Sequence, residues 1–110
     1  MQGEADASSG RAASVYNHTL AGFMKDIRTY LSVPDLPFTI GKITPPPPAA
    51  HKITVTDKQR YVVANDGYAE YVPACDLSMK PDDIWHYDTP SMKTRGNRFG
   101  EAVFRLTQTA

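Results

Sequence analysis

Residues 12–44 decide the fold, and they read AASVYNHTLAGFMKDIRTYLSVPDLPFTIGKIT. Apolar side chains recur in the first part at the i, i+4, i+7 and i+8 spacing of one helical face, which predicts a helix from Ala12 to Leu31. Pro34 ends this helix because it disfavours helical backbone at Val33 and has no amide of its own. The β-branched and aromatic residues from Pro37 to Thr44 then predict a strand. A helix that leads into a strand is typical of an α/β fold.

The rest of the chain continues the alternation of helices and strands. Residues 45–51 are rich in proline and predict a stiff surface loop. A second helix is expected from Thr54 to Asn65, and a strand, parallel to the first, from Tyr68 to Leu77. Pro81 and Pro90 interrupt regular structure, so a loop is predicted from Asp76 to Pro90. Apolar spacing predicts a final helix from Thr94 to Thr107. This order is that of a layered α/β sheet without its first strands.

Length and charge limit the classes of function. With 110 residues the chain is long enough for one small domain with one modest core. Twelve basic residues balance twelve acidic ones, so there is no net field to attract nucleic acid or anionic lipid. No apolar run approaches the roughly 18 residues of a membrane-spanning helix. We therefore expect neither a nucleic-acid nor a membrane partner.

Metal ligands and compartment signals are sparse. His18, His51 and His86 are far apart in sequence and Cys75 is the single cysteine, so neither a metal site nor a cofactor is expected. Cys75 is interpreted as a small buried strand residue. The residues after Met1 lack the layout of a signal peptide, although a signal in a longer, secreted parent is compatible with the sequence. The compartment therefore stays open.

Asp83 and His86 are the strongest catalytic candidates. A carboxylate three residues before an imidazole can accept from one ring nitrogen and leave the other as a base. The pair follows a predicted strand, and ligands of open α/β sheets bind at the carboxyl ends of strands. Two alternatives stay open: an Asp near a His more often stabilises a loop, and the aromatic side chains nearby are more often core than a wall for a sugar. Those aromatic residues are Tyr68, Tyr71, Trp85 and Tyr87.

A second polar cluster stands at the start of the chain, where Gln2-Gly3-Glu4-Ala5-Asp6 precedes the long helix. A loop that enters a helix offers amide donors to an anion. A polar chain terminus without function is the alternative, and composition alone favours it.

Together these clusters resemble the carbohydrate-esterase family of acetylxylan esterases and sialate O-acetylesterases, a branch of the SGNH (GDSL-like) hydrolases. The resemblance covers essentially the whole chain. It begins with the Gln2-Gly3-Glu4-x-Asp6 block, includes Asp83-x-x-His86 and ends with Gly96-x-Arg98. Between them it uses Tyr16, Leu20, Arg28, Leu36-Pro37-Phe38, Gly41, Gln59 and Asp76-Leu77.

The resemblance implies the fold and the roles of the site residues. Residues 1–110 would be a partial domain, the C-terminal part of a flavodoxin-like SGNH-hydrolase fold with three layers and a parallel sheet. His86 would be the general base, Asp83 the acid that orients it and Gln2 an oxyanion-hole donor. Glu4 and Asp6 would support the substrate, and Trp85 and Tyr87 are further candidates for contact with it.

One part of the family pattern is not found. The family's nucleophilic serine lies in a G-x-S block near its first strand, and no serine of this chain has that context. Our first hypothesis is therefore a segment of a serine acetylesterase that acts on an acetylated carbohydrate and is inactive without a missing N-terminal part. The second hypothesis is a truncated protein that binds carbohydrate or assembles with itself through the sheet edge exposed by missing strands.

Overall fold

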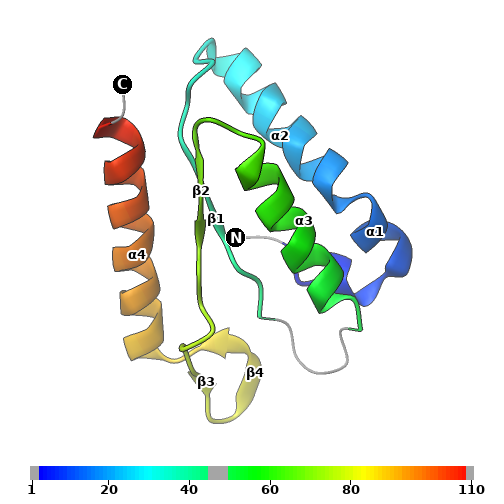
Figure 1. Ribbon diagram of the computed structural model, residues 1–110. Coiled ribbons are helices and arrows are strands. Elements are labelled where there is room, and N and C mark those ends of the chain that lie inside the picture. Colours follow the sequence, from blue (N-terminus) through cyan, green and yellow to red (C-terminus); the bar gives the residue numbers. More distant parts are fainter. Residues whose placement is uncertain (1–2, 45–49, 109–110) are drawn as a thin grey trace.

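The computed structural model of the protein describes residues 3–44 and 50–108. The chain contains both helices and strands, in the order that Figure 1 shows. A 3₁₀ turn, η1 (Asp6–Ser8), precedes α1 (Gly10–Ser14), α2 (Tyr16–Leu31), β1 (Phe38–Gly41), α3 (Lys52–Ala64), β2 (Ala69–Val72), β3 (Met79–Lys80), β4 (Asp83–Tyr87) and α4 (Thr89–Gln108).

Two parallel strands form the centre of the fold. β1 and β2 pair from Phe38 opposite Ala69 to Gly41 opposite Val72. α2 and α3 lie on one side of these strands and α4 lies on the other (Figure 1). The parallel pairing is therefore confirmed, and the structure is a small mixture of helices with short parallel and antiparallel sheets, which agrees with the α/β prediction. Within the described residues the parallel sheet has two strands, so the larger flavodoxin-like sheet stays a prediction.

The first predicted helix is interrupted. Val15 leaves helical geometry, with φ −106° and ψ 5°, and separates α1 from α2. The Oγ of Ser9 accepts the amide of Ala12 at 3.3 Å and so caps α1. α2 ends at Ser32, whose left-handed φ of 57° turns the chain back. Pro34 lies just beyond this turn, as the sequence predicted.

The hydrophobic core lies between the strands and the α2–α3 pair. One cluster joins Tyr16 of α2 to Val55 of α3 and Ile43 after β1, and a second joins Met24, Ile40 and Val62. Leu20 packs against both clusters and makes them continuous. Burial of each such side chain stabilises the fold by about 1.5–3 kcal/mol.

Gln59 links the helices to the strand inside this core. It belongs to α3 and is fully buried. Its Nε2 donates to the carbonyl oxygen of Gly41 at 3.1 Å and lies 3.5 Å from the Oη of Tyr16. An unpaired amide at this depth is costly, so the pairing fixes where α3 stands relative to the end of β1.

Three sequence predictions about residues 68–90 are wrong. The predicted strand from Tyr68 to Leu77 ends at Val72, because Pro73 has no amide to extend the ladder. Cys75 lies beyond it and is exposed, not buried. Residues 76–90 are not all loop, because β3 and β4 form an antiparallel hairpin. Its turn holds Pro81, a residue that favours tight turns.

The last helix begins five residues earlier than predicted. The Oδ1 of Asp88 accepts the amide of Ser91 at 2.8 Å and caps the helix. Pro90 stands in the first turn, where a missing amide costs nothing. None of the helices in the described residues is long and apolar enough to cross a membrane.

An ion pair fixes the end of α2 that lies far from the hairpin. The guanidinium of Arg28 donates to both carboxylate oxygens of Asp66, at 2.6 and 3.0 Å, and its Nε donates to the carbonyl of Leu36. The amide of Tyr68 also donates to Asp66. The hydrogen bonds from Arg28 lower the pKa of Asp66, and the bond from Tyr68 adds to the effect. The pair thus joins α2 to the entries of both strands.

We expect Asp66→Ala to lower the free energy of unfolding by about 2 kcal/mol at neutral pH, the range for hydrogen bonds to charged groups. The folded state binds fewer protons at Asp66 than the unfolded state does, so the contribution is present above about pH 4. It is lost as the pH falls through the lowered pKa. Urea unfolding from about pH 6 to pH 2 measures this. Asp26→Ala, an exposed change on α2, is the control. If the difference in the free energy of unfolding between the two variants does not change with pH, the prediction is wrong.

Candidate active site

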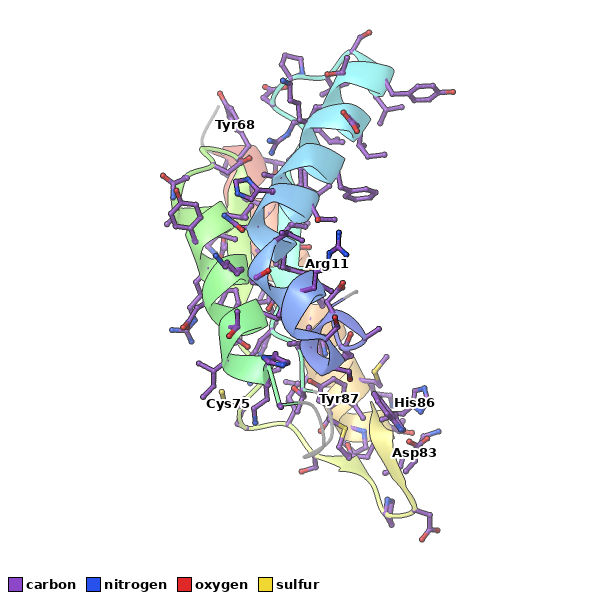
Figure 2. All side chains as sticks on the ribbon, turned by 90° about the vertical axis from the view of Figure 1, so that its right-hand side faces the viewer. Arg11, Tyr68, Cys75, Asp83, His86 and Tyr87 are labelled. Carbon is purple, nitrogen blue, oxygen red and sulfur yellow. The ribbon has the colours of Figure 1, made fainter. Side chains whose placement is uncertain are left out.

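The β3–β4 hairpin places the catalytic candidates at the carboxyl ends of β1 and β2. In Figure 2, Asp83 and His86 lie together at the end of the molecule opposite Tyr68. The Oη of Tyr87 hydrogen-bonds to the Oγ1 of Thr44, which follows β1, at 2.5 Å. The amide of Asp88 donates to the carbonyl of Ser78. The bond to Thr44 ties β4 to the edge of the sheet where α/β folds bind ligands, and the bond to Ser78 closes the hairpin.

Asp83 and His86 form the hydrogen bond that their spacing predicts. The Nδ1 of His86 lies 2.6 Å from the Oδ2 of Asp83. The side chain of His86 is 71% exposed, whereas that of Asp83 is 33% exposed. If the carboxylate accepts the Nδ1 proton, Nε2 is left as the basic nitrogen that faces solvent. This arrangement suits a general base.

Asp83 is held as a carboxylate by its neighbours. Its Oδ1 accepts the amide of Trp85 at 2.8 Å. The bond from Trp85 is the largest cause that lowers the pKa of Asp83, and the bond to His86 is the next. An ionised Asp83 fixes the tautomer of the imidazole and stabilises its protonated form.

A pocket opens beside His86 and has a volume of about 570 Å³. This volume suits a small ligand. Trp85 and Met92 line it and are each more than half exposed. Tyr87 also lines it but is buried, with its hydroxyl used by Thr44. Trp85 and Tyr87 thus both line the pocket with His86, and of the two only Trp85 is largely accessible.

The N-terminal polar block lies against the same end of β1. Gly3 has φ 132°, and a side chain added to it would meet Ile43, Tyr16 and Val55. Ile43 is next to Thr44, the residue that holds Tyr87. Glu4 and Asp6 are half-buried. Burial is the main cause of the raised pKa of Tyr16, and the charges of Asp6 and Glu4 add to it. Gln2, the predicted oxyanion-hole donor, lies outside the described residues.

Comparison with known proteins decides the family. The model of the family described as "Carbohydrate esterase, sialic acid-specific acetylesterase" matches residues 1–105. The chain belongs to this family. The search of the curated proteins and the search of the solved structures found no match to the chain. A carbohydrate-esterase origin is therefore shown for the chain as a whole.

Several residues that carry the acetylesterase resemblance have structural partners. Arg98 donates to both oxygens of Asp76, at 2.8 and 2.6 Å, and to the carbonyl of Pro73. This ties α4 to the loop that follows β2. Gln59 and Gly41 are joined by the hydrogen bond described above. Within residues 3–44 and 50–108, no group of three His, Cys, Asp or Glu side chains is placed to hold a metal ion.

Arg95 is a site residue that the sequence analysis missed. It belongs to α4 and is 4% exposed. Its guanidinium carbon lies 4.9 Å from the ring centre of Tyr87 and 5.4 Å from that of Phe99, and its Nη2 donates to the carbonyl of Lys42. It therefore packs beneath the strand that carries His86. The signal in the sequence is its place four residues before Phe99, on the apolar face of α4.

Gly41 leaves the space that Arg95 occupies. A Cβ at Gly41 would lie 2.7 Å from the ring of Phe99 and would also clash with the guanidinium of Arg95. We expect Gly41→Ala to lower the free energy of unfolding by about 1–3 kcal/mol, as overpacking does. Denaturant unfolding and the NMR signals of Tyr87 and His86 measure the loss and the movement of β4.

Gly96→Ala is the matched control, because nothing lies within 4 Å of a Cβ at that position on α4. It should raise the free energy of unfolding by about 0.5–1 kcal/mol through helix propensity. Equal effects of the two substitutions would show that Arg95 does not need the space at Gly41.

Proposed function

We propose that the chain supplies the general base and its orienting carboxylate for hydrolysis of O-acetyl groups on a carbohydrate. The observation that carries the proposal is the Asp83–His86 hydrogen bond beside an open pocket. Membership of a carbohydrate-esterase family supports it. In this proposal Asp83 and His86 are two members of a serine triad.

The chemistry follows from the free Nε2. A serine Oγ attacks the carbonyl carbon of the acetyl ester while Nε2 of His86 takes its proton. The C–O bond to the sugar then breaks, and the proton passes from His86 to the sugar oxygen. Water, deprotonated by the same nitrogen, attacks the acetyl-serine, which releases acetate and restores the hydroxyl. Asp83 stabilises the imidazolium in both steps.

Two serines of this chain, Ser9 and Ser91, have hydroxyl groups with structural hydrogen bonds. The hydroxyl of Ser9 caps α1, and that of Ser91 accepts the amide of Ser78. No serine in the described ranges hydrogen-bonds to His86. We therefore place the nucleophile outside them, in a larger flavodoxin-like sheet that β1 would continue. Gln2 would donate to the oxyanion, and Glu4 and Asp6 would support the substrate from the same edge. The chain is expected to be inactive without that part.

A chimera tests this assignment. Residues 1–110, which include Gln2, would replace the matching C-terminal part of an active acetylesterase of the family that retains its own G-x-S block. We expect a folded, active chimera in which His86→Ala and Asp83→Asn each reduce kcat/KM for an aryl acetate at least about a hundredfold. Circular dichroism verifies the fold of each variant.

His18→Ala, an exposed change on α2, is the matched control and should keep full activity. The isolated chain should hydrolyse the aryl acetate no faster than its His86→Ala variant. A folded chimera in which His86→Ala stays fully active would rule out His86 as the base.

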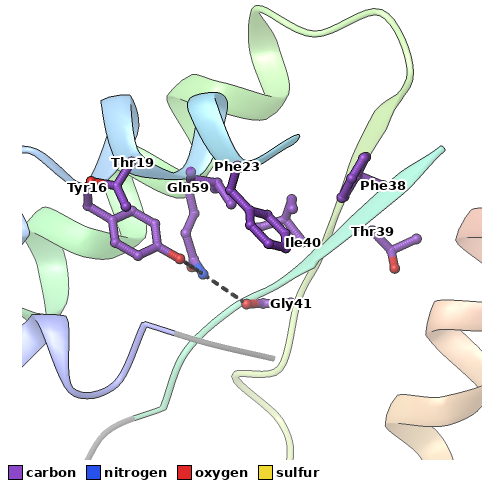
Figure 3. A pocket seen from close by; sticks show the side chains of 9 residues that line it. Tyr16, Thr19, Phe23, Phe38, Thr39, Ile40, Gly41 and Gln59 are labelled. Carbon is purple, nitrogen blue, oxygen red and sulfur yellow. Dashed lines mark hydrogen bonds between the residues drawn. The ribbon is translucent and has the colours of Figure 1, made fainter. Parts of the chain in front are cut away.

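A second candidate function is strand-mediated assembly without catalysis, and the open side of β1 favours it. Within the described residues β1 has one neighbour, β2. Phe38 and Lys42 donate their amides to the carbonyls of Tyr68 and Val72, so the backbone groups of Thr39 face away from β2. The carbonyl of Gly41 is already used by Gln59. An apolar cavity of about 320 Å³ lies beside this edge, and Figure 3 shows Phe23, Phe38 and Ile40 in its wall.

Sedimentation of the isolated chain tests assembly. If β1 recruits a strand from a second copy, the chain sediments as a dimer or larger assembly. Thr39→Pro removes an outward amide and keeps the bonds to β2, so it should yield folded monomers, whereas Thr39→Val should still assemble. A monodisperse monomer for the unmodified chain would contradict this function and leave the esterase proposal untouched.

A further inference from the structure

The apolar cavity beside β1 is lined by uncharged side chains. Leu20, Phe23, Phe38 and Ile40 supply most of its wall, and no charged residue of the described ranges completes it. In Figure 3 the rings of Phe23 and Phe38 and the side chain of Ile40 lie around one space. Transfer of a charge into such a site is costly, so the lining selects a neutral occupant.

Two aromatic rings shape the cavity for a third. The ring centroids of Phe23 and Phe38 lie 6.4 Å apart, and their planes meet at 76° in an edge-to-face pair. Phe23 is 57% exposed, and Thr19, one turn before it on α2, is exposed too, so the cavity opens to solvent beside this helix. A volume of about 320 Å³ is small for a ligand pocket and suits a molecule with one ring.

One buried acceptor of the lining lacks a donor. Gln59 is 1% exposed, and its Nε2 donates to the carbonyl of Gly41. Its Oε1 is also buried and accepts no hydrogen bond from the described residues. Other polar groups of the lining are used, since the hydroxyl of Thr19 donates to the carbonyl of Val15. A buried acceptor without a donor is costly, so a ligand that brings an O–H group is stabilised at Gln59.

We propose that this cavity binds a small uncharged phenol, whose ring packs against Phe23, Phe38 and Ile40 and whose hydroxyl donates to the Oε1 of Gln59. The uncharged lining excludes ions, the two rings favour an aromatic body, and the unpaired oxygen favours a ligand with a donor. Among the described residues, none lines both this cavity and the pocket beside His86. The inference therefore does not depend on the proposed esterase activity.

A matched pair of ligands tests the hydrogen bond. The purified chain would be titrated with 4-ethylphenol and with 4-ethylanisole, in which a methyl group replaces the hydroxyl proton. A ligand of this size is expected to bind with a dissociation constant of about 0.1–1 mM. The phenol should bind about fivefold more tightly than the ether, which has no donor. NMR measures both constants, and the side-chain amide signal of Gln59 should move with the phenol.

A substitution at the mouth of the cavity tests its location. Thr19→Phe places a ring at an exposed lining position, and the two residues have similar helix propensities, so the fold is kept. The new ring occupies the space of the ligand and should raise the dissociation constant of 4-ethylphenol at least about tenfold. Thr29→Phe is the matched control, because Thr29 is exposed on the same helix and does not line the cavity. Circular dichroism verifies the fold of both variants.

Three results would overturn the inference. They are no binding of 4-ethylphenol up to about 10 mM, equal affinities for the phenol and the ether, and an affinity that Thr19→Phe leaves unchanged. A fourth result would reject it in favour of a second copy of the chain. In that case the NMR signals of Phe23 and Ile40 change with protein concentration and do not respond to the phenol.

Discussion

The close packing around Gly41 is the constraint on which the rest of the structure depends. At this residue β1 ends, the amide of Gln59 reaches the backbone carbonyl from one side, and Arg95 and Phe99 pack against the Cα from the other. α3, on one side of the sheet, and α4, on the other, are therefore both positioned by their contacts with Gly41. A larger residue there would separate α4 from the sheet, and with it the strand that rests on Arg95.

The candidate site depends on that point through a short chain of contacts. Arg95 supports the ring of Tyr87, and the hydroxyl of Tyr87 is held by Thr44, three residues after Gly41. His86 precedes Tyr87 on the strand, so its position follows from theirs. The buried polar groups near the site serve to position it, whereas the two side chains that could contact a ligand, His86 and Trp85, stay accessible. This division is what an α/β fold allows at the carboxyl ends of its strands.

Local patterns predicted the elements of this fold better than their ends. The apolar spacing from Tyr16 to Leu31 and the run around Phe38 identified α2 and β1, because each pattern includes side chains that fill the core, such as Met24 and Ile40. The hairpin was missed because β4 is five residues long and its neighbours contain proline, which favours a loop prediction. The start of α4 was missed because Asp88 caps it through a side-chain bond that spacing does not reveal.

The site was predictable where its residues are neighbours in sequence and not where they are distant. Asp83 and His86 could be paired from their spacing, and the family match agrees with the origin that the motifs implied. Arg95 could not be placed, since its partners Lys42 and Tyr87 come from two other parts of the chain. A cation on an apolar helix face is a weak signal until the strand that covers it is known.

The three-residue separation of Asp83 and His86 also bears on how such a site assembles. Closing so short a loop loses little chain entropy, so the acid–base pair can form within its hairpin before distant parts of the sheet have met. The pair is in this sense a local unit, whose internal geometry is independent of how the substrate and the nucleophile are brought to it. Under the proposed function, the loops around this hairpin could change, and with them the choice of sugar, while the Asp83–His86 pair keeps its geometry.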